Sequence, residues 1–486
     1  MEKTIAMREI ELKLDLQPGD AEALESSALF GSRNRTVEQV STYFDTPELA
    51  LFDADLSLRI RQSGRKRVQT VKAENTTGAG LFARHEWERP IRGKTPVMDA
   101  HTPIPRLLAR HPGDLVPQFE VHVQRTTWTL DADGSAIEVA LDRGEIRADE
   151  RREPFCELEF ELKRGDPKSL FDLAHRIDAE IPVRLSVLSK AERGYRLEAR
   201  HCASKAEPIC LDAAMRVDDA FRLVVASCLR QYRLNEAVLL GRRAVGELHQ
   251  ARVALRRMRS ALTIFRPNVS DRGDRFNQDL QHLAAILGKA RDYDVFVAQL
   301  GPGLARDVAS AAHDVAYAEV EKALAGKATR RLMLDVAEWA SVSAVCVEAA
   351  DDEMPDTALR QFSTEALDRR WKQVAKYQKH LQGMNEAKLH QLRKDLKKLR
   401  YCAEFFASLA HGRSKARDEM IRAMKDLAAV LGKLVDGVIE RKLITELGLT
   451  DEPDVWEIPS IRDGDRLLKR AARRYARLLK ARPYWR

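Results

Sequence analysis

Two short segments of the N-terminal half carry acidic and basic side chains at every second position. They are Glu9-x-Glu11-x-Lys13 and Glu157-x-Glu159-x-Glu161-x-Lys163. Residues two apart on a β-strand project from the same face, so each segment predicts a strand with one carboxylate-rich face. Clustered carboxylates suit a hard divalent cation such as Mg²⁺ or Mn²⁺. A solvated sheet face is the alternative for either segment taken alone.

Further predicted strands add cations to this pattern. These residues are Arg59, Arg61, Lys72, Arg84 and Arg125. Arginine and lysine bind phosphate oxygens, and arginine does so in a bidentate fashion. If the intervening apolar residues packed inward, the strands would form an ordinary barrel. If they pack outward, the charged faces line the lumen and describe a metal–oligophosphate site.

The elements that must hold these residues are mostly strands. Alternating patterns over residues 7–200 predict roughly eight strands, enough to close an antiparallel barrel. A turn at 131–134 separates two of them, and short helices are expected at 20–30, 103–111 and 168–179.

Residues 7–198 resemble the CYTH domain, the family of triphosphate tunnel metalloenzymes. The resemblance lies in Glu9-x-Glu11-x-Lys13, Tyr43-Phe44-Asp45-Thr46, Arg59-Ile60-Arg61, Lys72, Arg84 with Glu86, Arg125, Glu138, the 157–163 strand and Ser189-Lys190-x-x-Arg193-Gly194-Tyr195. It implies an eight-stranded tunnel that acts on triphosphates. The family also includes adenylate cyclases and thiamine triphosphatases, so the substrate stays open.

The same resemblance implies roles for individual residues. The metal ligands would be Glu9, Glu11, Glu159 and Glu161, with Glu157 as a weaker candidate. The triphosphate would be held by Lys13, Arg59, Arg61, Lys72, Arg84, Arg125 and Lys190. Catalytic roles fall to Lys190, Glu9 and Glu11, through a water oriented by the metal or by Lys190.

The C-terminal half has helical periodicity and an internal repeat. Leu248-His249-Gln250-Ala251-Arg252 recurs as Leu389-His390-Gln391-Leu392-Arg393, and Leu283–Lys289 recurs as Leu427–Lys433. The order and the near-constant offset predict two copies of one helical unit, at about 216–345 and 355–486.

Each copy contains a helix with a cationic stripe beside an apolar one. The stripes are His249, Arg252, Arg256 and Arg259, and then His390, Arg393, Lys397 and Arg400; Arg257, Lys394 and Lys398 widen them. Residues 248–266 contain no carboxylate and 387–403 contain only Asp395. A solvated amphipathic helix is the alternative, but such a helix usually mixes charges of both signs. The repeat predicts that both stripes face one groove.

This pattern resembles the CHAD domain, a helical domain with a conserved histidine. The matching elements are His249–Arg259 and Leu287–Asp294, while the second copy has Lys397 in place of an arginine and keeps the other element only partly. The resemblance covers 216–486 and implies two four-helix bundles around a basic cavity that binds inorganic polyphosphate through the two widened stripes.

Charge and composition separate the two halves. Residues 1–215 carry 32 Lys and Arg against 37 Asp and Glu, a net charge of −5, whereas 216–486 carry 50 against 37, a net charge of +13. A basic half favours a polyanion. Nucleic acid is the rival ligand, but aromatic residues make up only 6% and none lies within 249–259. No apolar run approaches the ~20 residues of a membrane helix. The first residues do not resemble a signal peptide, and the six scattered cysteines suggest reduced thiols.

The sequence therefore predicts an α+β multidomain chain. Its parts are a β tunnel at 1–200, a linker at 201–215 and an all-α domain at 216–486. The predicted function is metal-dependent hydrolysis of inorganic triphosphate with polyphosphate binding, in the cytoplasm and at polyphosphate granules. The alternatives are a hydrolase or cyclase acting on an organic triphosphate, and a scaffold without enzymatic activity.

Overall fold

The computed structural model describes residues 5–27, 29–30, 35–73, 79–132, 134–197, 202–266, 271–345, 358–377, 383–410 and 412–486. The chain divides into two compact units. The first contains residues 1–203 together with helix α10 (Lys327–Val345), and the second contains the remaining helices after residue 204. Asp133 and Pro355, which bear on the expected turn and repeat boundary, lie outside the described residues.

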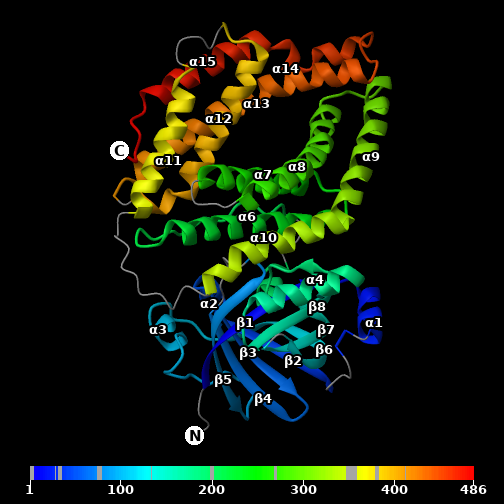
Figure 1. Cartoon of the computed structure of the whole chain (residues 1–486), viewed down its shortest axis with the longest axis vertical. Helices are drawn as coiled ribbons and strands as arrows, with labels where there is room; N and C mark the ends of the chain where they lie inside the picture. Colours follow the sequence, from blue (N-terminus) through cyan, green and yellow to red (C-terminus); the bar gives the residue numbers. More distant parts are fainter. Residues whose placement is uncertain are drawn as a thin grey trace. The chain divides into compact units, whose positions relative to one another are not determined.

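The first unit is a closed antiparallel barrel (Figure 1). Its strands are β1 (Ile5–Asp15), β2 (Arg35–Asp45), β3 (Leu56–Ser63), β4 (Lys66–Ala73), β5 (Leu81–Ile91), β6 (Val116–Ala132), β7 (Ser135–Ala148) and β8 (Arg151–Arg164). The order β5-β4-β3-β2-β6-β7-β8-β1 closes through pairing of β5 with β1, and the short β9 (Arg184–Leu185) adds to β1. The predicted eight-stranded tunnel is confirmed.

Strand register explains why the charged residues share one face. Glu11 pairs with Glu161 and Lys13 pairs with Glu159 across β1 and β8. Directly paired residues project to the same side of a sheet. The intervening Leu12 is completely buried on the opposite side of the strand. The apolar faces therefore pack outward and the charged faces line the lumen.

Helices cover parts of the outer face of the barrel. They are α1 (Pro18–Ser26), α2 (Ala50–Asp53), α3 (Ile104–Leu108) and α4 (Lys168–Glu180). Helix α5 (Lys190–Tyr195) instead contacts β6 and β7, and its Lys190 and Ala191 line the cavity of the barrel. Helix α4 contacts β1 and β8 through a buried face that includes Leu170 and Phe171. Leu58 and Ile60 of β3 lie in another core cluster with Ile104 of α3, which leaves Arg59 and Arg61 on the lumen side.

The second unit contains two successive sets of helices. The first set is α6 (Val217–Leu239), α7 (Val245–Ile264), α8 (Asp271–Val297) and α9 (Leu304–Ala325). The second set is α11 (Ala358–Ala375), α12 (Glu386–Phe405), α13 (Ser414–Glu446), the short α14 (Pro459–Arg462) and α15 (Gly464–Lys480). Helices α7 and α12 carry the two predicted stripes, and α8 and α13 carry the second repeated element. The order of elements follows the internal repeat.

Helix α10 departs from the expected domain arrangement. By sequence it falls within the helical domain expected at 216–486, and within its first copy at 216–345. The structure instead groups it with the barrel, where it contacts α4, β5 and β9. Its Arg330 forms an ion pair with Asp178 of α4, and both side chains are buried. This buried pair anchors α10 to the covering helix of the tunnel.

Within the described ranges, none of the helices has the length and apolar character needed to span a membrane.

Candidate functional site

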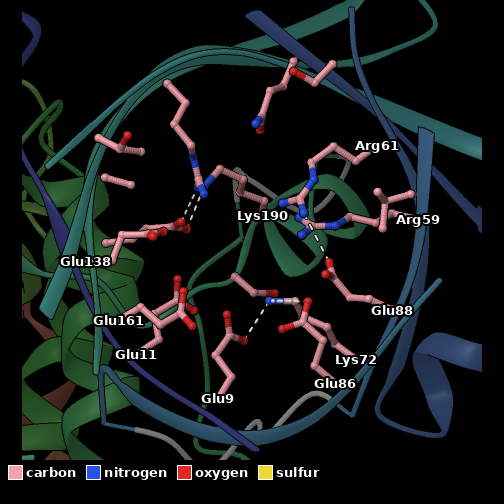
Figure 2. Close-up of a pocket in the computed structure, with 18 of the residues that line it drawn as sticks. Glu9, Glu11, Arg59, Arg61, Lys72, Glu86, Glu88, Glu138, Glu161 and Lys190 are labelled. Carbon is pink, nitrogen blue, oxygen red and sulfur yellow. Dashed lines mark hydrogen bonds and ion pairs between the residues drawn. The ribbon is translucent and has the colours of Figure 1, made fainter. Parts of the chain in front are cut away.

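The barrel encloses a cavity of about 760 Å³ whose lining is dominated by charged side chains. Figure 2 shows how these side chains are distributed around the ring of strands. The carboxylates of Glu9, Glu11, Glu138 and Glu161 follow one arc, whereas Arg59 and Arg61 project from the opposite arc. We call the first arc the acidic wall and the second the basic wall; Glu88 lies beside Arg61 on the basic wall, and Lys72 and Glu86 lie between the two arcs.

Two residues of the acidic wall bind lumen cations. Glu9 accepts hydrogen bonds from Lys72 at 2.7 Å and from Arg84 at 3.1 Å. Glu11 accepts from Lys13 at 2.8 Å and from Arg84 at 3.0 Å. Burial alone would raise the pKa of Glu9, but Lys72 and Arg84 hold it well below the ordinary value. Glu9 is therefore ionised throughout the neutral range.

The pKa values of Glu11 and Glu161 are shifted upward, in the opposite direction to that of Glu9. Burial and the neighbouring Glu159 raise the pKa of Glu11 to about 7. Burial also raises the pKa of Glu161, with added repulsion from Glu9 and Glu138, although Lys163 opposes the shift. Burial is the largest cause of both shifts and neighbouring carboxylates add to it, so a nearby cation would favour the ionised form of each group.

Lys190 lies in a buried network of carboxylates. Its ammonium contacts Asp142 at 2.6 Å and Glu159 at 2.7 Å, and it also contacts Glu157. Burial opposes the charge, but these three carboxylates raise the pKa of Lys190 above its ordinary value. Lys190 is therefore a protonated donor and not a proton acceptor. Its capacity to orient a water remains a prediction.

Glu159 and Glu157 have surroundings unlike those of Glu11 and Glu161. Glu159 contacts three cations, namely Lys13, Arg125 and Lys190. Glu157 is fully buried, pairs with Lys190, and does not line the cavity. Both therefore contact protein cations, as Glu9 and Glu11 do, and Glu157 differs from the other expected metal ligands in lying outside the cavity lining.

The basic wall contains the two arginines of β3. Arg61 donates to Glu88 at 3.1 Å, and Arg59 lies 3.5 Å from the Tyr43 hydroxyl. The buried Nε of Arg59 has no hydrogen-bond partner among the described residues. Repulsion from Arg59, followed by burial, lowers the pKa of Arg61. This wall therefore has an unsatisfied donor, although Glu86 and Glu88 stabilise the charge of Arg59.

Several lining residues had no assigned role in the sequence prediction. Arg35, Arg65 and Lys66 are exposed residues at strand ends and also line the cavity. Asp142 binds Arg125 through two hydrogen bonds at 2.7 and 2.6 Å, besides contacting Lys190. Its position on a predicted strand was recognisable, but its partners depend on the register of β6, β7 and β8.

Two of the sequence motifs position this site. Asp45 is fully buried, accepts backbone N–H groups at the start of α2, and accepts the Tyr195 hydroxyl at 2.9 Å. Ser189 caps α5 through a reciprocal pair of hydrogen bonds with Glu192. Lys190 is the first residue of that helix. The cap and the Asp45–Tyr195 bond together fix the element that holds Lys190.

The two cationic stripes of the helical unit come together. Helices α7 and α12 contact each other. Lys397 of α12 interacts electrostatically with Arg252 and Arg256 of α7, and His249 interacts with Lys397. Arg291 of α8 also acts on His249 and Arg252. We call these residues and Arg393 the cationic cluster: His249, Arg252, Arg256, Arg291, Arg393 and Lys397.

The second repeated element supports the cluster in both copies. Arg252 lies 3.5 Å from Asp292, and Arg393 lies 3.6 Å from Asp436. A Cβ at Gly288 would meet the Arg252 guanidinium at 3.3 Å, and one at Gly432 would meet that of Arg393 at 3.7 Å. A side chain at Gly288 would therefore press on Arg252, whereas the approach at Gly432 is an ordinary van der Waals contact, so the space is tight in the first copy and not in the second.

Burial and neighbouring cations lower the pKa values of two bases in the cluster. Burial, followed by repulsion from Arg256 and Arg393, lowers the pKa of Lys397 to about 5. Burial and Arg291 lower the pKa of His249 to about 4. Both groups are therefore neutral near pH 7 and would gain protons beside a bound anion.

The other residues of the predicted stripes lie outside the cluster as defined, although His390 interacts electrostatically with its members Arg393 and Lys397. Arg257 does not lie on the cationic edge where the sequence analysis placed it. It is buried, donates to Glu404 at 3.2 Å and lies over the Phe405 ring. Arg259 donates to Asn277 and Gln281. The remaining four differ in exposure: Lys394 is exposed, whereas His390, Lys398 and Arg400 are half-buried, and Arg400 donates to Glu404.

Two protein-family models match successive parts of the chain. Residues 7–195 match the model of the CYTH domain, and residues 223–445 match that of the CHAD domain. A Haemophilus influenzae protein named inorganic triphosphatase is 33% identical over 204 residues, which are 41% of this chain and 57% of that protein. The chain thus matches little more than half the length of this relative.

Solved structures give similar matches. The CHAD domain of the plant Ricinus communis is 27% identical, with a TM-score of 0.45, over 59% of this chain and 96% of that one. A Hippeastrum protein, described as an adenylyl cyclase candidate with a dominant triphosphatase activity, is 23% identical. Its TM-score is 0.30, and the match covers 38% of this chain and 95% of that one. On the family matches, the chain contains a CYTH domain followed by a CHAD domain.

Proposed function

We propose that the tunnel hydrolyses inorganic triphosphate to diphosphate and phosphate with Mg²⁺ or Mn²⁺, and that the helical unit binds inorganic polyphosphate. The observation that carries the first part is the pair of opposed walls in one cavity (Figure 2). A triphosphate chain and a divalent cation together need both kinds of wall, because the cations of the protein hold phosphate oxygens and its carboxylates hold the metal.

The lining favours an inorganic substrate over an organic one. Tyr43 is the one aromatic residue among the described residues that line the cavity, and its ring is stacked on Phe119 with centroids 4.7 Å apart. A nucleobase or a thiamine ring gains much of its binding energy by stacking on aromatic side chains. The name of the Haemophilus relative points in the same direction.

The acidic wall fits a hard divalent cation. Its donors are carboxylate oxygens, and burial raises the pKa values of Glu11 and Glu161, so a bound dication would favour their ionised forms. Glu9, Glu11 and Glu161 would hold the ion, with Glu138 beside them. Glu159 and Glu157 are weaker candidates because Glu159 already contacts three protein cations and Glu157 does not line the cavity. A bound divalent cation withdraws charge from phosphate oxygens and makes an attacking water more acidic.

The basic side chains would bind and orient the substrate. Arg59 offers its unpaired Nε, and the guanidinium groups of Arg59 and Arg61 repel each other. An anion bound between them would accept a hydrogen bond from that Nε and reduce the repulsion. Lys13, Lys72, Arg84 and Arg125 lie nearer the carboxylates and would exchange part of those contacts for phosphate oxygens. Lys190 stays protonated in its carboxylate network and would donate a hydrogen bond to the attacking water or to a phosphate oxygen.

The cationic cluster supports the second part of the proposal. It joins cations from α7, α8 and α12, and three carboxylates pair with them among the described residues, namely Asp292, Asp294 and Asp436. A phosphate chain with a charge on every unit is a matching ligand. The same ligand would draw the protein to polyphosphate granules in the cytoplasm. Nucleic acid is the competing polyanion.

The test is an assay of purified full-length protein with tripolyphosphate, ATP and thiamine triphosphate. We expect phosphate release from tripolyphosphate with Mg²⁺ or Mn²⁺ and its loss on adding a chelator. Conversion of ATP to a cyclic product in preference to tripolyphosphate cleavage would refute the inorganic assignment, and inertness toward all three would favour a scaffold. Competition between polyphosphate and single-stranded RNA tests the helical unit, and tighter binding of RNA would contradict the proposal.

A further inference from the structure

A second group of potential metal ligands lies outside the tunnel, where α10 packs against α4. His175 of α4 faces Asp335 and Glu338 of α10. Asp335 and Glu338 are three residues apart, so they occupy one face of their helix. Their side chains are 28% and 12% exposed and that of His175 is 22% exposed, so the group remains accessible from solvent.

The distances within this group are too long for good hydrogen bonds. His175 Nε2 lies 3.3 Å from Asp335 Oδ1 and 3.5 Å from Glu338 Oε2. Hydrogen bonds between nitrogen and oxygen are usually 2.7–3.2 Å long. Ligand atoms about 2.1 Å from a tetrahedral Zn²⁺ are separated from each other by about 3.4 Å. The observed separations therefore match two edges of a tetrahedral metal site.

We propose that His175, Asp335 and Glu338 bind a divalent transition-metal ion, with Zn²⁺ as the best fit. A neutral imidazole with two carboxylates carries two negative charges, which a dication balances. A mixed nitrogen and oxygen ligand set favours Zn²⁺ over Mg²⁺, because imidazole is a poor ligand for the harder ion. Solvent access leaves room for a water as the fourth ligand.

Neighbouring contacts hold the two helices at a fixed spacing. Arg330 of α10 donates to Asp178 of α4 at 2.5 Å, and both side chains are buried. Lys327 adds a hydrogen bond to the carbonyl oxygen of Ala179. Asp178 lies three residues after His175, so this anchor is on the neighbouring turn of α4. The metal would add a second link between α10 and the tunnel unit.

The experiment titrates metal-free full-length protein with Zn²⁺ by calorimetry. All proteins carry Glu9→Gln and Glu11→Gln, so that binding at the tunnel carboxylates is reduced equally. We expect this parent protein to bind one equivalent of Zn²⁺ more than the same protein with His175→Asn or Asp335→Asn. Co²⁺ should give the visible absorption of a four-coordinate ion in the parent, and this signal should disappear in both variants.

His101→Asn is the matched control. His101 also lies beside a carboxylate, at 2.9 Å from Asp99, but its side chain is 83% exposed and it has no second acidic partner in the described part of the chain. It should retain the parent stoichiometry. Equal Zn²⁺ stoichiometry in the parent and His175→Asn would overturn the proposal and leave His175 as an ion-pair partner. If His175→Asn does not fold, Asp335→Asn decides.

Discussion

The tunnel and the cationic cluster differ in how they arrange charge. In the tunnel, carboxylates and cations line one cavity, and carboxyl pKa values are shifted both upward, at Glu11, and downward, at Glu9. In the cluster the bases have few acidic partners, and Lys397 and His249 both have lowered pKa values. We therefore expect the mixed charge of the tunnel to serve a metal-assisted reaction and the unbalanced positive charge of the cluster to serve binding alone.

The largest expected effect is on tripolyphosphate turnover, which distinguishes the tunnel from the cationic cluster. Glu9→Gln with Glu11→Gln should reduce tripolyphosphate turnover by about 1,000-fold or more, because the acidic wall loses two charges that would hold the metal. Steady-state phosphate release measures this loss. Polyphosphate affinity should stay within twofold of wild type, which serves as the internal control. Unchanged turnover would refute the assignment of these residues.

A second prediction concerns a stripe residue that the structure places in the helical core. Arg257→Gln should lower the free energy of unfolding by about 2 kcal/mol, because a buried partner of Glu404 and a cation over Phe405 are both lost. Urea unfolding followed by circular dichroism measures the change. A stable variant that binds polyphosphate weakly would instead make Arg257 a ligand-binding residue.

A third prediction tests the cluster directly. Arg252→Gln with Arg393→Gln should weaken polyphosphate binding by about 100-fold, since each lost charge-assisted contact is worth about 1.5 kcal/mol. The slope of affinity against salt concentration should also become shallower. Lys394→Ala is the matched control, because Lys394 is exposed and lies outside the cluster. An equal effect of the control would show that net charge, and not the cluster, sets affinity.

The smallest expected effect is on pH dependence. Lys397 and His249 have pKa values of about 5 and about 4, so both are neutral at pH 7 and take up protons when a polyanion binds. Binding coupled to proton uptake strengthens as pH falls, by about tenfold between pH 8 and pH 6. Calorimetry in buffers of different ionisation enthalpy detects this uptake. Affinity that rises with pH would contradict the assigned protonation states.

Strand faces were predictable from the sequence because alternation has a period of two. The face with Glu9, Glu11 and Lys13 follows from that period, and so does the face with Arg59 and Arg61. The correspondence of Arg252 with Arg393 was predictable for another reason, because the sequence segment around them is repeated. Alternation does not reveal which face points inward. That depends on Leu12 and its neighbours packing under α4, which is a tertiary property.

Partners distant in sequence were not predictable in the same way. Asp142 joins the Lys190 network through strand register, and Arg257 is buried through its contact with Glu404, which is 147 residues away. The docking of α10 on the barrel depends on Arg330 meeting Asp178 across 152 residues. Helical periodicity identifies an apolar face but does not identify the element that covers it.

The most direct test of the proposed chemistry is a competition measured by phosphorus NMR. Tripolyphosphate, ATP and thiamine triphosphate are mixed at equal concentration with full-length protein and Mg²⁺, because paramagnetic Mn²⁺ would broaden the phosphorus signals. Opposed acidic and basic walls without an aromatic platform predict that tripolyphosphate disappears first and gives diphosphate and phosphate in equal amounts. Consumption of ATP or thiamine triphosphate ahead of tripolyphosphate would contradict that account.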